Sequence, residues 1–262
     1  ANSDAIMVCS INNRTKEIRL VYVYRDTYLD TGDGNYRKCT EAYAAGGASR
    51  AVAMLNRNLD LNISHYVTLN FDALVELVDI FGGVDINLSE GEVQWLNGYL
   101  VEGREVLGRE CPDVPGPGLQ HLNGMQALAY CRIRYIGLDY ERTERQREIL
   151  SQVIAKAKGS DLITLNSVAD ALLPKISTDL SVIDMVRLAA GARKYTVAET
   201  KGFPFDKTTM LLDAGDCVIP VDLAGNVSQL HAWLYGEEGY LPSGTVSAIS
   251  ANISAATGIY AY

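Results

Sequence analysis

Residues 5–24 read AIMVCSINNRTKEIRLVYVY, and the fold prediction depends on this stretch. Its two halves, 5–11 and 18–24, are rich in β-branched and aromatic residues, which are typical of strands. The polar segment 12–16 has the composition of a turn, so the pair predicts a β-hairpin. Both halves carry apolar residues on both faces, which indicates a sheet that is covered on two sides.

Helix and strand patterns alternate after this hairpin. Helical spacing of apolar residues predicts helices over 48–59, 71–81, 122–128, 142–158, 182–190 and 226–235. Short apolar runs predict strands at 66–70, 84–88, 130–135 and 217–221. Segment 89–120 has the composition of a long loop, and 246–262 that of a tail or an edge strand. Because strands and helices interleave, we expect a single α/β domain over residues 1–262, with a mixed sheet between helical layers.

Composition excludes several classes of protein. The chain has 262 residues, of which 48% are hydrophobic, enough for a substantial core. Its formal net charge of -9 argues against general nucleic-acid binding, because a duplex would be repelled. No apolar run approaches the roughly 18 residues of a membrane span, and the first residues lack the pattern of a signal peptide.

The five cysteines do not predict a metal site, because none lies in a Cys-x-x-Cys pair and the chain has three histidines. Cys9 and Cys131 lie in apolar, strand-like runs and are expected in the core. Cys39 and Cys111 lie in loop-like surroundings, and the sequence leaves open whether they form a disulfide.

Segment 129–147 holds five arginines, an unusual concentration of positive charge in an acidic chain. Side chains alternate along a strand, so the predicted strand places Arg132 and Arg134 on one face. Three residues share a face of the following helix by the i, i+3, i+4 rule: Arg142, Arg145 and Gln146. Two arginine pairs near a helix N-terminus suit an anion with several oxygens, since guanidinium groups match phosphate geometry.

Ion pairing with neighbouring acids is the alternative. Three acids lie nearby in the sequence: Glu141, Glu144 and Glu148. Exposed pairs of this kind contribute about 0.3–0.5 kcal/mol. We assign Arg147 to such a pair. For Arg132 and Arg134 the alternative explains less, because like charges on one strand face repel unless an anion or acid lies beside them.

Several short motifs occur together in a defined order. They are SDAIM at 3–7, RDT at 25–27, Lys38 with AY at 42–43 and GG at 46–47, NF at 70–71 with VD at 78–79 and GGV at 82–84, LNGMQALAY at 122–130, and RTERQ at 142–146. The set resembles the LytR-CpsA-Psr family of cell-wall phosphotransferases, strongly over 3–158 and weakly beyond. Several motifs in register are more specific than any one of them.

This resemblance implies a fold, an activity and a location. Family members have a catalytic domain on the outer face of the plasma membrane of Gram-positive-type bacteria, anchored by an N-terminal membrane helix. They move a teichoic acid or a capsular polysaccharide from a polyprenyl-pyrophosphate carrier to peptidoglycan, forming a phosphodiester. The resemblance also implies that Mg²⁺, with Mn²⁺ as the alternative, bridges the pyrophosphate, and that the lipid lies in an apolar tunnel between the sheet and helices.

The resemblance also assigns residues. Asp4 matches the family's metal-binding and catalytic aspartate, and Arg25 matches the catalytic arginine that contacts the pyrophosphate. The phosphate-binding set corresponds to Arg132, Arg134, Arg142 and Gln146, with Arg145 alongside and Arg134 counted among the catalytic residues. Asp26 either orients Arg25 or is structural.

Departures from the family pattern keep other functions open. Tyr24 replaces the usual proline, Thr40 an asparagine and Cys39 an aliphatic residue. The family often has a second aspartate at a position that precedes residue 1. The alternatives are a non-catalytic module that binds the carrier lipid or regulates, and a pyrophosphatase that hydrolyses the carrier.

Overall fold

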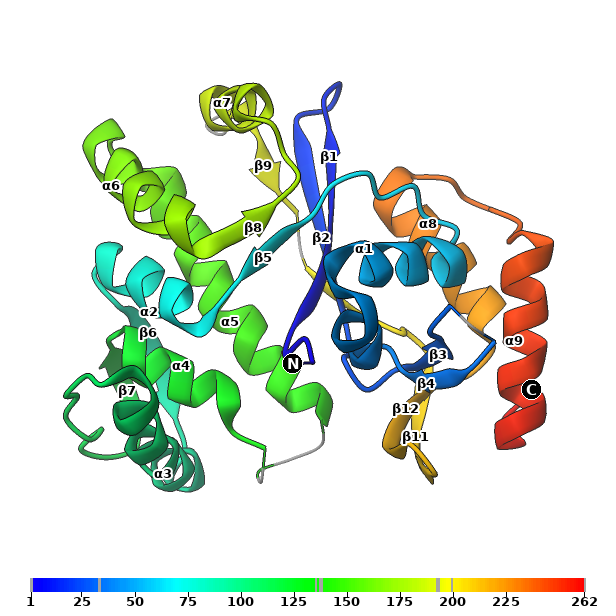
Figure 1. Ribbon diagram of the computed structural model, residues 1–262, viewed down its shortest axis with the longest axis horizontal. Coiled ribbons are helices and arrows are strands. Elements are labelled where there is room, and N and C mark those ends of the chain that lie inside the picture. The colour runs from blue at the N-terminus through cyan, green and yellow to red at the C-terminus, as the bar shows by residue number, and fades with distance from the viewer. Residues whose placement is uncertain are drawn as a thin grey trace. The chain divides into compact units, whose positions relative to one another are not determined.

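A computed structural model describes residues 2–32, 34–134, 136, 139–191, 194–198 and 200–261 (Figure 1). Its Cα positions divide into two compact units: unit 1 comprises Ala1–Tyr66 and Leu180–Tyr262, and unit 2 comprises Val67–Asp179. Each unit contains both helices and strands, so the mixed α/β class is confirmed. One domain over residues 1–262 stays a prediction, because two compact units can belong to one domain.

The predicted hairpin is present in unit 1. Strand β1 (Ile6–Asn12) pairs antiparallel with β2 (Glu17–Val23). Strands β9 (Thr196–Val197) and β10 (Lys201–Phe203) pair parallel with β2, which makes the sheet mixed. The second half of β2 is buried, whereas β1 lies at an edge of the sheet as described. Cys9 is therefore exposed, and its expected place in the core was wrong.

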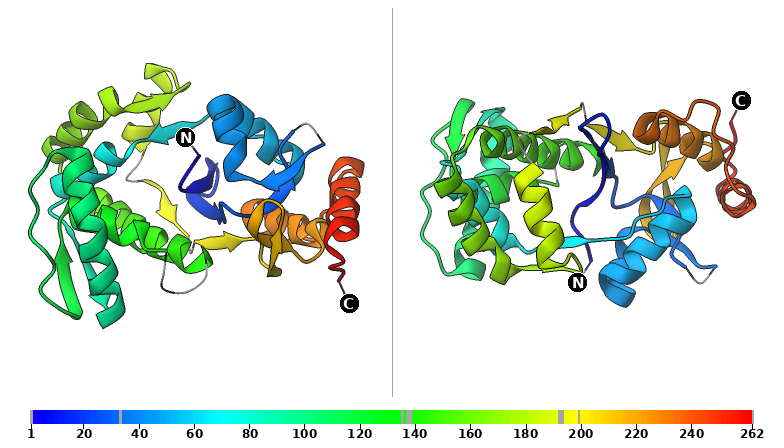
Figure 2. Two further views of the ribbon diagram at one scale, coloured as in Figure 1. Left: turned by 60° about the horizontal axis from the view of Figure 1, so that its bottom comes forward. Right: turned by 90° about the horizontal axis from the view of Figure 1, so that it is seen from above.

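Helices and strands together form the core of unit 1. The remaining elements are β3 (Tyr28–Asp30), β4 (Tyr36–Lys38), α1 (Thr40–Leu59), α7 (Val182–Gly191), β11 (Lys207–Leu212), β12 (Gly215–Pro220), α8 (Leu223–Tyr235) and α9 (Gly244–Thr257). Figure 2 shows α9 beside α8. Apolar residues of the sheet, α1, α8 and α9 pack together, among them Val21, Met54, Leu230 and Ile249.

Helix α9 corrects the prediction of a tail or an edge strand at 246–262. Ser243 begins the helix, because its Oγ accepts a hydrogen bond from Val246 N at 3.2 Å. Val246, Ile249 and Ile253 are buried on one face. Small serines and alanines fill the other positions, so the sequence shows little of the polar contrast by which a helix is recognised.

Unit 2 is mostly helical. Its elements are β5 (Val67–Leu69), α2 (Phe71–Ile80), β6 (Val84–Leu88), α3 (Glu90–Leu107), β7 (Gly118–Leu122), α4 (Gly124–Arg132), α5 (Asp139–Gly159), α6 (Leu162–Leu172), the 3₁₀ turn Leu173–Lys175 and β8 (Ile176–Thr178). Two antiparallel pairs, β5 with β8 and β6 with β7, contribute its strands. The predicted helices at 71–81 and 142–158 and the strand at 84–88 are confirmed.

The expected long loop at 89–120 was wrong over most of its length. Ser89 and Glu92 form a capping box: Ser89 Oγ accepts from Glu92 N at 3.3 Å, and Glu92 Oε2 accepts from Ser89 N at 3.0 Å. Leu96 and Leu100 are fully buried on the inner face of α3. Strand β7 then occupies the end of the predicted loop.

The expected strand at 130–135 was also wrong. Helix α4 runs to Arg132, and all its residues from Gly124 to Cys131 are buried. The helix predicted at 122–128 is therefore present, but it continues to Arg132. Because its residues are buried up to Cys131, no polar face marks this continuation in the sequence. Tyr135 lies outside the described residues. The argument that strand alternation places Arg132 and Arg134 on one face therefore fails.

An ion-pair network in unit 2 gives a pH-dependent prediction. Asp72 contacts Lys175 Nζ and lies 2.7 Å from Arg109 Nη2. The hydrogen bond from Lys175 lowers the pKa of Asp72 below its usual value. Such a carboxyl stabilises the fold above its unfolded pKa of about 4, and this contribution is lost as pH falls through the lower folded value.

We expect Asp72→Asn to lessen the fall in the free energy of unfolding between about pH 6 and about pH 3, measured by urea denaturation. Asp170→Asn, an exposed substitution on α6, serves as the matched control. An unchanged pH dependence in Asp72→Asn would contradict the assignment.

In the part of the chain that the structure describes, no helix combines the length and apolar character that a membrane crossing requires.

Candidate functional site

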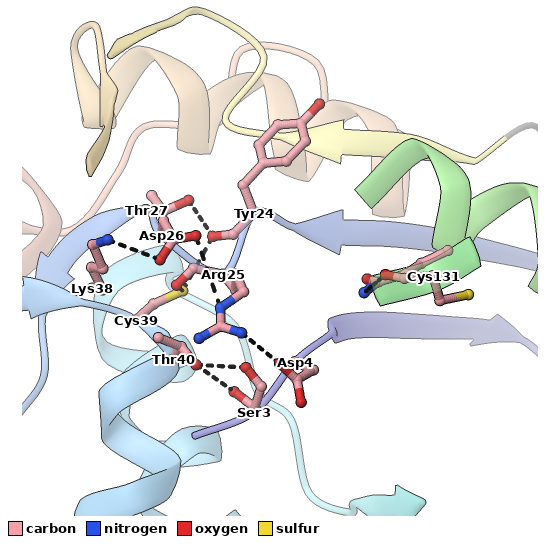
Figure 3. Close-up of polar contacts among 11 residues, drawn as sticks. Ser3, Asp4, Tyr24, Arg25, Asp26, Thr27, Lys38, Cys39, Thr40 and Cys131 are labelled. Atoms are coloured by element: carbon pink, nitrogen blue, oxygen red, sulfur yellow. Dashed lines mark hydrogen bonds and ion pairs between the residues drawn. The ribbon is translucent and has the colours of Figure 1, made fainter. Parts of the chain in front are cut away.

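The turn that follows β2 is the rigid centre of the candidate site in unit 1 (Figure 3). Thr27 closes it, because its N and Oγ1 both donate to Tyr24 O, at 2.9 and 2.6 Å. Cys39 N donates to Thr27 O at 2.8 Å, and Thr40 N donates to Arg25 O at 3.0 Å. The backbone of Arg25 is thus held against the start of α1.

Arg25 and Asp4 meet at this turn. Arg25 Nη1 lies 2.6 Å from Asp4 Oδ1, and the two side chains are 12% and 42% exposed. The segment carrying Asp4 is tied to α1, since Thr40 Oγ1 donates to the backbone oxygen of Ser3 at 2.5 Å. Thr40, a departure from the family pattern, therefore helps to place Asp4 (Figure 3).

Asp26 lies between two cations. Its Oδ2 is 3.8 Å from Arg25 Nε and its Oδ1 is 3.2 Å from Lys38 Nζ, with the residue buried. Its backbone oxygen accepts from Val218 N at 2.9 Å, so β12 also supports the turn. These contacts favour the interpretation that Asp26 orients Arg25. Lys38 is a residue to which the sequence assigned no role, although it stands in one of the motifs.

Cys39 also supports this turn. Its Sγ lies 3.3 Å from Tyr24 O and 3.2 Å from Arg25 O, within reach of both acceptors. Burial raises the pKa of the Cys39 thiol, so the sulfur stays protonated and acts as a weak donor. All five cysteines are free thiols, so the structure does not contain a disulfide between Cys39 and Cys111.

The remaining predicted residues lie in unit 2, around the end of α4. Arg132, the last residue of α4, is half-buried with Nη2 2.8 Å from Glu102 Oε1, and Arg134 is exposed. Arg142 is buried in α5. The expected ion pair of Arg147 is confirmed, with Glu144 as its partner.

Arg145 and Gln146 hold the backbone around the end of α4. Arg145 Nη2 donates to the backbone oxygens of Ile133 and Ile136, both at 3.1 Å, and Gln146 Nε2 donates to Cys131 O at 3.4 Å. These contacts support the segment that carries the exposed arginine. Roles of the predicted residues in binding phosphate stay predictions.

The donors present are consistent with a magnesium ion held mainly by its substrate. Among the described residues, no group of three or more His, Cys, Asp or Glu side chains could hold a metal. Mg²⁺ often binds through one or two carboxylates and completes its shell with waters and phosphate oxygens. Asp4, half-exposed beside Arg25, is a carboxylate of this kind.

Sequence comparison shows which known proteins this chain is similar to. Residues 1–217 match the LytR_cpsA_psr family. The chain is 36% identical over 200 residues to the polyisoprenyl-teichoic acid--peptidoglycan teichoic acid transferase TagU of Enterococcus faecalis, covering 73% of this chain and 59% of TagU. It is 29% identical over 189 residues to TagT of Bacillus subtilis, covering 72% and 56%. The chain thus spans less than two thirds of these relatives.

Solved structures share the fold. TagT bound to LIIa-WTA superposes with a TM-score of 0.66 at 21% identity, covering 98% of this chain and 86% of TagT. The TagV structure from B. subtilis gives a TM-score of 0.69 at 23% identity, covering 92% and 91%.

Proposed function

Because the chain belongs to the LytR-CpsA-Psr family, we propose that it transfers a glycopolymer from a polyprenyl-pyrophosphate carrier to peptidoglycan. The names of the relatives TagU and TagT, which are teichoic acid transferases acting on peptidoglycan, support this proposal. A location at the outer face of the plasma membrane and an N-terminal membrane anchor belong to the same proposal.

One observation carries the proposal: the 2.6 Å pair of Arg25 and Asp4 on a turn that is hydrogen-bonded to α1. Phosphoryl transfer depends mostly on positioning and on neutralising charge that spreads over the phosphate oxygens. A guanidinium held at a fixed place, with a half-exposed carboxylate beside it, meets both requirements.

The reaction that we propose forms one bond and breaks one. The acceptor hydroxyl oxygen bonds to the phosphorus that bears the glycan, and its proton passes to a base. The bond from that phosphorus to the bridging oxygen breaks, and polyprenyl phosphate leaves. Arg25 binds the pyrophosphate oxygens and stabilises their charge, and Asp26 and the turn hold Arg25 in place.

Asp4 would hold Mg²⁺, or Mn²⁺ in its place. When bound, the ion supplies positive charge against the pyrophosphate oxygens. The charges of the neighbouring side chains support the assignment of a metal ion to Asp4. Arg25 and Lys38 are balanced by Asp4 and Asp26, so the four side chains bring no net positive charge to a dianionic substrate.

In unit 2, Arg132, Arg134 and Arg142 would bind the pyrophosphate. The contacts of Arg145 and Gln146 with backbone oxygens support a different role for these two residues, which is to hold the backbone around the end of α4. An apolar tunnel for the lipid stays part of the proposal.

The test is transfer from a polyprenyl-pyrophosphate-linked sugar to peptidoglycan fragments with Mg²⁺ present. We expect transfer, and we expect Arg134→Ala to lower its rate by about tenfold or more, because a charged donor to the phosphate is lost. Arg147→Ala, which removes an arginine paired with Glu144, is the control.

Full activity of Arg134→Ala would contradict the assignment of Arg134 to the pyrophosphate site. Carrier binding without transfer would instead indicate a binding module, and phosphate release without acceptor a pyrophosphatase.

A further inference from the structure

Arg132 is held by aromatic rings in unit 2. Its guanidinium carbon lies over two rings, 5.4 Å from the centroid of Phe71 and 5.5 Å from that of Tyr99. Its Nη2 is 2.8 Å from Glu102 Oε1. We call Phe71, Tyr99 and Glu102 the Arg132 clamp.

Three helices bring the clamp together. Phe71 is the first residue of α2, whose start is fixed by Asn70 Oδ1 accepting from Ala73 N at 2.8 Å. Tyr99 and Glu102 are three residues apart on α3, so they lie on one face of that helix. Helices α2 and α3 both pack against α4, which ends at Arg132. The position of Arg132 is thus set by helices rather than by a loop.

The two kinds of contact use different parts of the guanidinium. Aromatic rings attract a cation through their faces and leave the N–H groups at the guanidinium edge able to donate. That edge donates to Glu102, whose side chain is 52% exposed. A carboxylate at such a position is readily replaced by a competing anion, because an exposed ion pair is weak.

We propose that Phe71 and Tyr99 are positioning residues for Arg132, and that Glu102 occupies its anion-binding edge until a pyrophosphate group displaces it. This inference rests on the proposed function, in which Arg132 binds the pyrophosphate. It adds that the affinity of the site is raised by the two rings and lowered by Glu102, so the clamp sets how tightly the carrier headgroup is held.

Calorimetric titration of the full chain with inorganic pyrophosphate tests both parts of this proposal, the role of the two rings and the role of Glu102. Phe71→Leu with Tyr99→Leu removes the rings, and we expect pyrophosphate to bind about three- to tenfold more weakly. Glu102→Gln removes the competing charge while keeping the shape, and we expect binding about two- to fivefold tighter. A lipid-free probe separates these effects from contacts with the carrier's tail.

Matched controls are available on the same helices. Phe81→Leu removes an aromatic ring directly after the last residue of α2, and Glu105→Gln removes the same charge one turn further along α3. Both are expected to bind pyrophosphate as the unchanged protein does. Thermal melting of every variant shows whether a loss of binding reflects a loss of folded protein.

The outcomes distinguish this inference from the proposed function. If Arg132→Ala weakens binding but the ring and Glu102 variants match their controls, the clamp is refuted and the proposed function stands. Weaker binding by Glu102→Gln would show that Glu102 anchors Arg132 and does not compete with the ligand. If Arg132→Ala binds pyrophosphate normally, the assignment of Arg132 in the proposed function fails as well.

Discussion

Arg25→Ala is expected to lower the rate of glycopolymer transfer by about 10²–10³-fold, with little change in the amount of folded protein. The reason is that the guanidinium is fixed before the substrate arrives, by the turn after β2 and by contacts with Asp4 and Asp26. A preorganised donor of this kind stabilises charge in the transition state without a reorganisation cost. The measurement is single-turnover transfer to peptidoglycan fragments.

Two variants sharpen this prediction. Arg25→Lys keeps the positive charge but loses the planar, forked arrangement of N–H donors. We expect this variant to have less than a tenth of the transfer rate of the unchanged protein. Arg37→Ala, on nearby β4, removes an arginine that is 59% exposed and 3.7 Å from Glu41, and it should transfer normally. If Arg25→Ala works within about threefold of the unchanged protein, the turn is not the reactive centre.

Gly124→Ala is expected to destabilise the protein by about 3 kcal/mol. Gly124 is the first residue of α4, and a Cβ there would lie 2.1 Å from the backbone oxygen of Val75 in α2. Backbone atoms in a packed helix cannot turn away as a side chain can, so α4 must shift. Because α4 ends at Arg132, the shift should also weaken pyrophosphate binding. Urea denaturation measures the first effect and calorimetry the second.

Gly98→Ala provides a control of opposite sign. Gly98 lies within α3, and a Cβ there meets nothing within 4 Å. Alanine favours the helical backbone over glycine by about 1 kcal/mol, so this variant should be more stable. A similar loss of stability in both variants would mean that close packing of α4 on α2 is not the cause.

Elements whose signals are local were predicted from the sequence. The β1–β2 hairpin follows from strand composition around a polar turn. Helix α2 follows from its apolar spacing, and it ends just before Gly82 and Gly83, both of which have positive φ in the structure. Helix α4 was predicted in its first part, at 122–128, but its last turn was taken for a strand because its residues are buried up to Cys131. Helix α9 was missed because it is built from small residues and shows little amphipathic contrast.

The sequence by itself determined the α/β class, the hairpin and the kinds of residue that suit a pyrophosphate site, because composition, periodicity and motif order are properties of neighbouring residues. Apart from the local ion pair of Arg147, only the tertiary structure decided what the charged side chains of the site contact. It brings Asp4 to Arg25, places Asp26 between Arg25 and Lys38, and sets Arg132 against Phe71 and Tyr99. Apart from the neighbours Arg25 and Asp26, these partners are separated along the chain, and only packing of whole helices and strands brings them within a few ångströms of each other.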